Sequence, residues 1–314
     1  MTARPQVSVI VPVFNRQAWL GETLDSIASQ NFDDYEVIVI DDGSTDASLR
    51  VAEERESVSD GRIRVVSIGN SGVPTARNVG MAQAHGDYFA FLDSDDAWLP
   101  GHLEKAMAAF EHDPDLGLVH ANIERVDPHG RHLEVPVRHW HECDEPFETI
   151  ALRHEHVACS TAVVSRSAIE AVGDFDERFT GLGCEDRDLW LRIADRFRIR
   201  YLDHIGTRYR VHPAGLSSDG VRMDRARRLL IEKLAQSDRG HELVAAMEAM
   251  LESDLGLESL THRQYRNAIR QQWLAIRLDP SARVLWKRMA RTLAAACLSV
   301  LSPGHGATGA RSPR

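Results

Sequence analysis

The sequence predicts an α/β fold: a doubly wound, mostly parallel central sheet flanked by helices, with a helical C-terminal appendage. Apolar, β-branched runs such as Val7–Val13 alternate with stretches that carry an apolar residue every three or four positions. This is the pattern of buried parallel strands separated by amphipathic helices. From Met223 onward almost every segment has helical periodicity. A length of 314 residues suits one large domain with an appendage, or two domains.

In the first half of the chain, strands and helices alternate. The expected strands are Val7–Val13, Glu36–Ile40, Ile63–Ile68 and Tyr88–Leu92, and the expected helices are Ala18–Gln30, Asp46–Glu56 and Pro74–His85. Asp46 is a suitable N-cap, Pro74 suits a first helical turn, and Gly86 suits a helix end. In such folds the functional groups lie at the carboxyl ends of the strands.

The second half is less regular. Its expected elements are a helix over Pro100–Glu111, strands over Leu116–Ile123 and Cys159–Ser165, a short helix ending at Val172 and an amphipathic helix over Glu185–Phe197. The C-terminal helices are expected at Arg225–Leu234, Glu242–Leu251, His262–Ile276 and Ala282–Leu301. We therefore expect a first domain over residues 1–217, a helical region over 218–302 and a disordered, Gly/Ser/Pro/Arg-rich tail over 303–314.

The composition argues against several classes of protein. A formal charge of -10 argues against a nucleic-acid-binding protein, whose surface is usually basic. The four cysteines lack CxxC spacing and suit free thiols in a reducing compartment. The N-terminal apolar run is short and lacks a cleavage site, and no run approaches the roughly 18 apolar residues of a membrane-spanning helix. We expect a cytoplasmic protein, with any membrane contact peripheral at the inner face of the plasma membrane.

Two clusters of aspartate follow buried strands. Asp41-Asp42-Gly43-Ser44-Thr45-Asp46 comes after Val37–Ile40, and Asp93-Ser94-Asp95-Asp96 comes after Tyr88–Leu92. Taken singly, each is compatible with a turn or a helix cap. Carboxylates brought together at strand ends repel one another and lose hydration, a cost that a divalent cation removes. Because Mg²⁺ or Mn²⁺ is usually held by one or two carboxylates and by substrate phosphates, the clusters indicate an enzyme that handles a nucleotide diphosphate.

Other nucleotide-binding motifs are missing. No GxGxxG follows the first strand and no GxxxxGK[ST] occurs, so neither a dinucleotide fold nor a P-loop is supported. The segment Pro12–Arg16 follows instead, with an aromatic face for a base and a cation for phosphates. The motifs then occur in a definite order: Val9–Arg16, Asp41–Asp46, Gly72–Gly80 with its Ala76-Arg77-Asn78, Asp93–Asp96, and Glu185-Asp186. In this combination, over roughly residues 5–215, the chain resembles the family 2 inverting glycosyltransferases with the GT-A fold.

The resemblance implies a set of site residues. Those that bind the donor nucleotide and its diphosphate would be Pro12, Phe14, Arg16, Asp41, Asp42, Arg77, Asp93, Ser94, Asp95 and His212. In this set Asp42 would accept a hydrogen bond from the base, Asp41 would support that turn, and Arg77 would approach the diphosphate or donor sugar. Mn²⁺ or Mg²⁺ would be held by Asp95 and Asp96, although the extra aspartate leaves open which carboxylate coordinates directly.

The resemblance also implies a general base, Asp186, with Glu185 as its acceptor-binding or orienting neighbour, and places His212 over the diphosphate. The chemistry agrees with these roles. Departure of a nucleotide diphosphate leaves negative charge that a metal and an arginine stabilise, and the attacking hydroxyl must lose its proton to a carboxylate. A single base on the face opposite the leaving group gives inversion.

The same residues suggest a donor and an acceptor, and two other functions are possible for such a chain. Asp42 suits the imide of uracil or thymine, so a UDP-sugar is the first expectation, and the acceptor is expected to be a hydroxyl of a glycan or lipid-linked glycan. The histidine-rich stretch from His139 to His156 fits no familiar zinc spacing and is expected to help bind that acceptor. The rivals are a sugar-nucleotide nucleotidyltransferase, which would release pyrophosphate, and a non-catalytic nucleotide- or glycan-binding relative.

The last predicted helix, Ala282–Leu301, mixes apolar residues with cations. Arg283, Lys287, Arg288 and Arg291 occupy its first half, and its end is nearly apolar. Such a helix is compatible with three arrangements: contact with an anionic membrane surface, packing on the catalytic domain, or pairing of two copies in a homodimer.

Overall fold

The structure is a computed structural model that describes residues 4–134, 146–152, 157–213, 215 and 219–301. The chain divides into two compact units, one ending at Leu230 and the other beginning at Ile231. The division therefore falls within helix α8 (Gly220–Leu234). The boundary expected at 217–218, the tail expected over 303–314 and the histidines at 139, 141, 154 and 156 lie outside the described residues.

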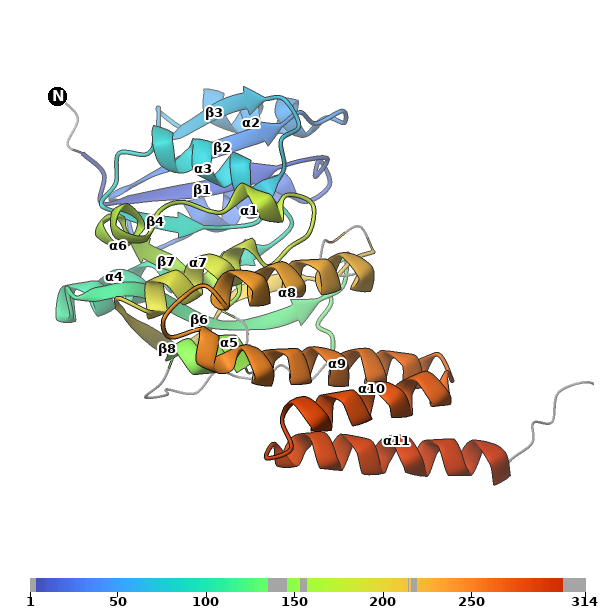
Figure 1. Cartoon of the computed structure of the whole chain (residues 1–314). Coiled ribbons are helices and arrows are strands. Elements are labelled where there is room, and N and C mark those ends of the chain that lie inside the picture. Colours follow the sequence, from blue (N-terminus) through green and yellow to red (C-terminus); the bar gives the residue numbers. More distant parts are fainter. Residues whose placement is uncertain (1–3, 135–145, 153–156, 214, 216–218, 302–314) are drawn as a thin grey trace, which may run out of the picture. The chain divides into compact units, whose positions relative to one another are not determined.

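The first unit is built on one central sheet (Figure 1). Within the described residues this sheet has eight strands, in the order β3-β2-β1-β4-β7-β6-β8-β5. In chain order they are β1 Val7–Val13, β2 Tyr35–Asp42, β3 Ile63–Ile68, β4 Tyr88–Phe91, β5 Ala97–Trp98, β6 Leu116–Val126, β7 Val163–Ser165 and β8 Arg198–Arg210. The four strands β3, β2, β1 and β4 are parallel, as are β6 and β8, whereas β7 is antiparallel to β4 and β6, and β5 to β8. The predicted α/β class is confirmed.

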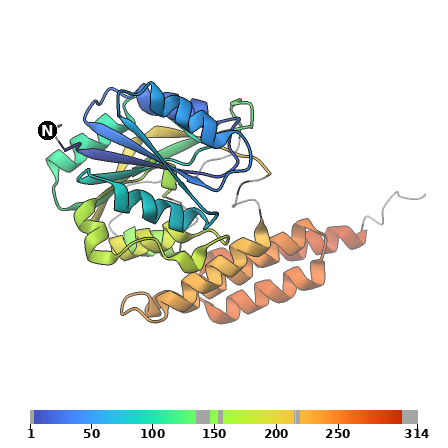
Figure 2. The ribbon, with the colours of Figure 1, turned by 90° about the horizontal axis from the view of Figure 1, so that it is seen from above.

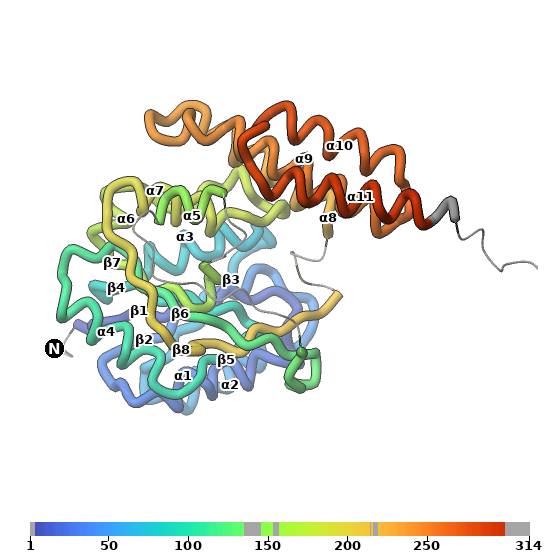
Figure 3. The backbone as a smooth tube through the Cα atoms, turned by 90° about the horizontal axis from the view of Figure 1, so that it is seen from below, coloured from blue at the N-terminus to red at the C-terminus, as the bar shows by residue number. Residues whose placement is uncertain are grey.

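Helices cover both faces of the sheet (Figures 2 and 3). They are α1 Leu20–Ala28, α2 Ser48–Ser57, α3 Val73–Gln83, α4 His102–His112, α5 Pro146–Leu152, α6 Arg166–Val172 and α7 Glu185–Ala194. On β2, Val37 and Val39 belong to the core that includes residues of α1, α2 and α4, whereas Ile38 and Ile40 pack with Ala76 of α3. A strand buried on both faces must be apolar at every position, which explains the continuous apolar runs of the sequence.

Several elements differ from expectation: β5 and α5 were not expected, and two further strands depart from their predictions. The segment expected as the strand Cys159–Ser165 begins as a 3₁₀ turn, Cys159–Thr161, in which the Thr161 N–H donates to the Ala158 carbonyl at 2.9 Å. Only Val163–Ser165 pairs as a strand. Strand β8 (Arg198–Arg210) has no counterpart among the expected elements, because its many charged residues leave no clear apolar alternation in the sequence. Its pairing with β6 shows that tertiary context, more than local propensity, makes it a strand.

The second unit is helical. It contains the end of α8, then α9 (Val244–Thr261), α10 (Tyr265–Leu278) and α11 (Arg283–Leu301), which pack on one another around Ala249, Ala275, Ile276, Leu285 and Met289. Helix α9 continues to Thr261, beyond its expected end at Leu251. It stops there because Arg263 takes a left-handed conformation, with φ of 58°, which breaks the helix before α10. The predicted C-terminal helices are present. Among the described residues, no helix is both long and apolar enough to cross a bilayer.

Candidate active site

The aspartate clusters lie at the same edge of the sheet, at the carboxyl ends of β2 and β4 (Figure 1). Strand β1 runs between these two parallel strands, so segments about fifty residues apart in sequence flank its carboxyl end. The loop after β1 is locked to the loop after β2 by Asn15. Its amide oxygen accepts from the Thr45 N–H at 2.8 Å, and its own N–H donates to Ser44 Oγ at 3.1 Å. Asn15 has φ of 54°, a left-handed conformation that asparagine tolerates.

The two aspartates at the end of β2 are both buried but differ in their partners. Asp42 accepts backbone N–H groups on both oxygens, from Ser71 at 2.6 Å and from Gly72 at 2.8 Å. Asp41 accepts from the Ser44 N–H at 3.3 Å through Oδ2, and its Oδ1 atom has no partner among the described residues. The structure therefore ties Asp42 to the loop before α3, whereas Asp41 has a buried Oδ1 atom without a partner among the described residues.

Arg77 on α3 joins the second aspartate cluster to α7. Its guanidinium donates to Asp93 at 2.6 Å and to Glu185 at 2.7 Å, and the residue is 2% exposed. Burial raises the pKa of Asp93, and the charge of Arg77 opposes that rise. The resemblance implies that Arg77 approaches the diphosphate or donor sugar. In the structure its guanidinium forms a buried bridge between two motifs 92 residues apart, Asp93 and Glu185.

Asp95 faces two cationic or titratable side chains. Its Oδ2 atom accepts from Arg16 Nε at 2.8 Å and lies 2.9 Å from His212 Nε2. Burial alone would raise the pKa of Asp95, but the hydrogen bond from His212 and the charge of Arg16 outweigh it and lower the pKa. The Oδ1 atom of Asp95 has no hydrogen-bond partner within the described ranges. The structure thus brings together Arg16, Asp95 and His212, as the resemblance implies.

Asp96 lies deeper and is held by the protein on both oxygens. Oδ2 accepts from Ser160 Oγ at 2.5 Å, and Oδ1 accepts from the Arg210 N–H at 2.8 Å. Burial, and then the charges of Asp95 and Asp93, raise the pKa of Asp96 well above its usual range. Asp96 therefore fixes the loop after β4 against β8.

Arg210 and Trp19 complete this frame and were not among the predicted site residues. Arg210, at the end of β8, donates to the Asp95 carbonyl at 2.8 Å and to Glu22 at 2.7 Å. The Trp19 ring lies 4.6 Å from that of His212, with the guanidinium carbon of Arg210 5.8 Å from its centroid. Arg210 belongs to the motif Tyr209–Pro213, in which the sequence already marks His212 as a site residue. The structure adds that Arg210 reaches the loop after β4 and helix α1, because β8 pairs with β6 and β5.

Asp186 occupies the first turn of α7. It is half-buried, and its Oδ1 accepts from the Arg187 N–H at 2.7 Å. Burial, followed by the charge of Glu185, raises the pKa of Asp186 to about 7. A carboxyl group with such a pKa changes protonation state near neutral pH, as a general base requires.

The loop that leads into α7 is held by α3. The Asn78 amide group donates to the Phe175 carbonyl at 2.9 Å and accepts from the Phe175 N–H at 3.0 Å. Cys184, just before the helix, has φ of 65°, an unusual conformation for a residue with a Cβ atom. Helix α3 thus fixes the position of the turn that carries Glu185 and Asp186.

Three further predicted residues are Pro12, Phe14 and Ser94. Pro12 is buried within β1, opposite Ile40, so it contributes to the sheet. Phe14 is 39% exposed at the strand end, where its ring is accessible. Ser94 is buried, and its carbonyl accepts from Thr23 Oγ1 at 3.1 Å.

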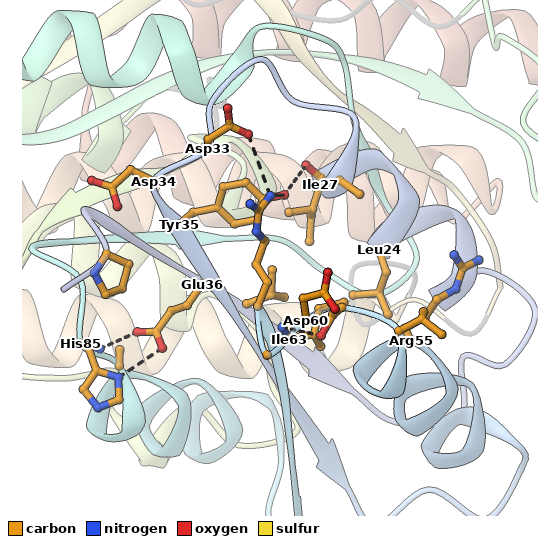
Figure 4. Close-up of a pocket in the computed structure, with 18 of the residues that line it drawn as sticks. Leu24, Ile27, Asp33, Asp34, Tyr35, Glu36, Arg55, Asp60, Ile63 and His85 are labelled. Atoms are coloured by element: carbon orange, nitrogen blue, oxygen red, sulfur yellow. Dashed lines mark hydrogen bonds and ion pairs between the residues drawn. The ribbon is translucent and has the colours of Figure 1, made fainter. Parts of the chain in front are cut away.

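A hollow of about 1130 Å³ lies at the opposite edge of the sheet, around the start of β2 (Figure 4). It is lined by Tyr35, Glu36 and His85, and the His85 N–H donates to Glu36 at 2.6 Å. None of the predicted site residues is among its lining residues, so the candidate site is the cluster of aspartates and arginines at the carboxyl ends.

The residues at Asp95 fit a divalent metal. The Oδ1 atom of Asp95, which has no partner among the described residues, and the adjacent imidazole of His212 are donors that Mn²⁺ accepts, and Mg²⁺ accepts the carboxylate. Among the described residues, no group of three or more His, Cys, Asp or Glu is arranged to hold an ion. Substrate phosphates and water would have to supply the other ligands, which is the usual arrangement for Mg²⁺.

Solved structures share this architecture. TarS from S. aureus, in complex with UDP-GlcNAc, has a TM-score of 0.64 at 21% identity, covering 95% of this chain and 91% of that one. Mannosyltransferase PcManGT from Pyrobaculum calidifontis, in complex with GDP-Man and Mn²⁺, also has a TM-score of 0.64 at 21% identity, covering 96% and 88%. At these identities the likeness establishes the fold, which is the predicted GT-A fold.

Sequence comparison gives the family. The family model described as Glycosyl transferase family 2 matches residues 8–173, and the chain belongs to this family. Putative glycosyltransferase EpsH from Bacillus subtilis is 33% identical over 46% of this chain. Putative teichuronic acid biosynthesis glycosyltransferase TuaG from the same organism is 41% identical over 33% of it, and O-antigen biosynthesis protein RfbC from Myxococcus xanthus is 32% identical over 62%.

These relatives are longer than the matched region. The alignments cover 41% of EpsH, 41% of TuaG and 15% of RfbC, so the chain spans less than two thirds of each. The predicted enzyme class, a glycosyltransferase, is confirmed by the family.

Proposed function

We propose that the protein is a metal-dependent inverting glycosyltransferase that moves a sugar from a nucleoside-diphosphate sugar to a hydroxyl of a glycan or glycolipid. The observation that carries the proposal is the link from Asp93 through Arg77 to Glu185, next to Asp186. Asp186 combines a pKa of about 7 with a fixed position on α7. Such a carboxylate can take a proton from a sugar hydroxyl at neutral pH.

The donor would lie along the carboxyl ends of β1, β2 and β4. Phe14 offers a ring for stacking on the base. Asp41 Oδ1, which is buried and without a partner among the described residues, would be the acceptor for an imide N–H, which favours a UDP-sugar. In this proposal Asp41 takes the role that the sequence assigns to Asp42, because both oxygens of Asp42 already accept backbone N–H groups. TarS and PcManGT, with UDP-GlcNAc and GDP-Man respectively, support a nucleotide-sugar donor without naming its base.

The diphosphate would face Arg16, Asp95 and His212. Mn²⁺ held by Asp95 and His212, or Mg²⁺ held by Asp95, would neutralise charge on the leaving diphosphate. Arg16 is placed to contribute a second positive charge there. Asp96 is proposed to support this loop and not to coordinate, since protein donors occupy both of its oxygens.

Asp186 would accept the proton of the attacking hydroxyl as the new bond to the anomeric carbon forms. A single base on the face opposite the diphosphate gives a product of inverted configuration. Glu185 would act through Arg77 as a positioning residue. The names of TuaG and RfbC support a surface polysaccharide as the acceptor. We place this chemistry in residues 1–217, with 218–302 as a helical region and 303–314 as a tail, in a cytoplasmic protein.

The test is nucleoside diphosphate release from UDP-, GDP- and dTDP-sugars with Mn²⁺ or Mg²⁺, with and without EDTA. We expect release from one class of donor, and we expect EDTA or Asp95→Ala to abolish it. Asp96→Asn should lower expression or stability, while the activity of the protein that folds should still depend on the metal. NMR of the product gives the anomeric configuration. Release of pyrophosphate would instead identify a nucleotidyltransferase, and retention of configuration would contradict the role of Asp186.

A further inference from the structure

The helical hairpin formed by α10 and α11 has an unusual charge. The two helices contain seven Arg or Lys and no Asp or Glu, in a chain whose formal charge is -10. The preceding helix, α9, has the opposite composition, with four acidic residues and no basic one. The hairpin is therefore a local concentration of positive charge in an acidic protein.

The same hairpin exposes large apolar side chains. Six of the eleven exposed large apolar residues in the described part of the chain lie on it: Leu274 and Trp273 on α10, and Val284, Trp286, Leu293 and Leu298 on α11. Trp273 and Trp286 are 51% and 48% exposed. Their rings meet nearly edge to face, with centroids 6.3 Å apart, and Trp286 Nε1 donates to the Pro280 carbonyl at 3.0 Å. The tryptophans thus form one fixed apolar patch across both helices.

Cations and tryptophans share the outer faces of the two helices. On α10 the exposed residues Arg270, Trp273 and Arg277 follow one another at spacings of three and four, which places them on one stripe. On α11 the exposed residues Arg283 and Trp286 do the same. Their opposite faces are buried, at Gln272, Ala275 and Ile276 of α10 and at Leu285, Met289 and Thr292 of α11.

We propose that this outer face of α10 and α11 binds the surface of an anionic lipid membrane. Tryptophan pairs suit the boundary between headgroups and acyl chains, and arginine stems can bury their methylenes there while the guanidinium contacts lipid phosphate. Lys and Arg clusters are attracted to anionic lipids. Since no described helix spans a bilayer, the contact is peripheral, with the helices lying on the membrane.

The charge also argues against a second copy as the occupant. A two-fold symmetric contact through this face would place two sets of like charges against each other. Arg288, the one half-buried cation of the set, is already ion-paired with Asp254 of α9 at 2.9 Å, and the six exposed cations remain on the outer face.

The experiment is flotation of the full chain with lipid vesicles. We expect binding to phosphatidylcholine vesicles with about 30% phosphatidylglycerol to be at least about tenfold tighter than binding to phosphatidylcholine alone, and to weaken in about 0.5 M NaCl. Arg270→Glu with Arg277→Glu should weaken binding by about tenfold or more. Trp273→Phe with Trp286→Phe should retain binding but lose the quenching of tryptophan fluorescence by brominated lipid.

The matched control reverses two exposed charges in the first unit, Arg50→Glu with Arg131→Glu, and should leave vesicle binding unchanged. Circular dichroism and nucleoside diphosphate release check that each variant is folded. Equal binding to neutral vesicles, no binding, or an equal loss in the control would overturn the proposal. So would a dimer in ultracentrifugation that disappears in Trp273→Ala with Trp286→Ala. Vesicle binding is read without donor or acceptor, so its failure is distinguishable from failure of the proposed activity.

Discussion

The arginines of the two units are used in opposite ways. In the first unit Arg77 and Arg210 are buried, and each joins elements that are far apart in the chain. In the second unit Arg270 and Arg277 are exposed on a helix without an acidic residue. A buried guanidinium fixes geometry, because its loss leaves unpaired charges in the core, whereas an exposed one is available to a partner. The environment of the cation, and not its type, separates positioning from binding.

The largest effect is expected at the base that Arg77 helps to position. Asp186→Asn should lower kcat by about 10²- to 10⁴-fold while leaving donor affinity within about twofold, because only proton transfer is lost. Steady-state kinetics and calorimetric titration of the donor measure the two effects. Because the pKa of Asp186 is raised from 3.8 to about 7 in the folded protein, the wild type loses stability as pH rises between these two values. The variant should therefore be no less stable than the wild type at pH 8. A kcat within tenfold of wild type would remove Asp186 from the mechanism.

The comparison itself is tested by the same substitution in both units. Arg77→Met should cost about 3–5 kcal/mol in free energy of unfolding, because Asp93 and Glu185 are left without their partner. Arg277→Met, on the exposed stripe, should stay within about 0.5 kcal/mol. Urea unfolding monitored by circular dichroism measures both. Similar losses at the two positions would mean that burial does not distinguish them.

The pH dependence of the reaction is the next effect in size. With a pKa of about 7 for Asp186, kcat should fall by about tenfold for each pH unit below that value, because the base becomes protonated, and should level off above pH 8. The small residual activity of Asp186→Asn should not show this slope. A wild-type profile that is flat between pH 5 and 8 would assign the rate to another group.

The last prediction concerns the pH dependence of stability caused by the buried histidines. Unlike the buried arginines, which stay charged, these histidines are neutral in the folded protein. Burial lowers the pKa of His102 and His120 to about 3. Between that value and the ordinary pKa of about 6.5, the unfolded chain binds more protons, so stability is lost as pH falls, by up to about 1.4 kcal/mol per pH unit for each histidine. His102→Gln should have a correspondingly shallower fall from pH 6 to 4 in urea titrations, and the exposed control His129→Gln should match the wild type.

Much of the first unit follows from sequence because its strands are buried on both faces. Val7–Val13 and Ile63–Ile68 have the predicted bounds, and β2 merely extends to include Asp41 and Asp42. The family motifs likewise mark Asp93, Asp95 and His212 as neighbours of one site. These are local patterns, readable one segment at a time.

The partners of the site residues could not be predicted in the same way. Arg77 lies 108 positions from Glu185, and Arg210 lies 115 positions from Asp95. The second contact also depends on strand β8, which local propensity does not indicate. The same holds for the roles of Asp41 and Asp42, which alternate faces of one strand and so meet different neighbours. Short motifs therefore identify the residues that can carry chemistry, whereas their hydrogen-bond partners come from distant parts of the sequence.

Helix α3 has a consequence for how this enzyme could be altered. Its first residues follow Gly72, whose N–H binds Asp42 and where an added Cβ would lie 2.5 Å from the Thr180 side chain. Further along the same helix, Arg77 binds Glu185, and Asn78 binds Phe175 in the loop that leads to it. A library of variants that aims to change donor or acceptor choice should therefore keep positions 72, 77 and 78 constant. A substitution there would disturb both the proposed donor-binding residues and the proposed general base.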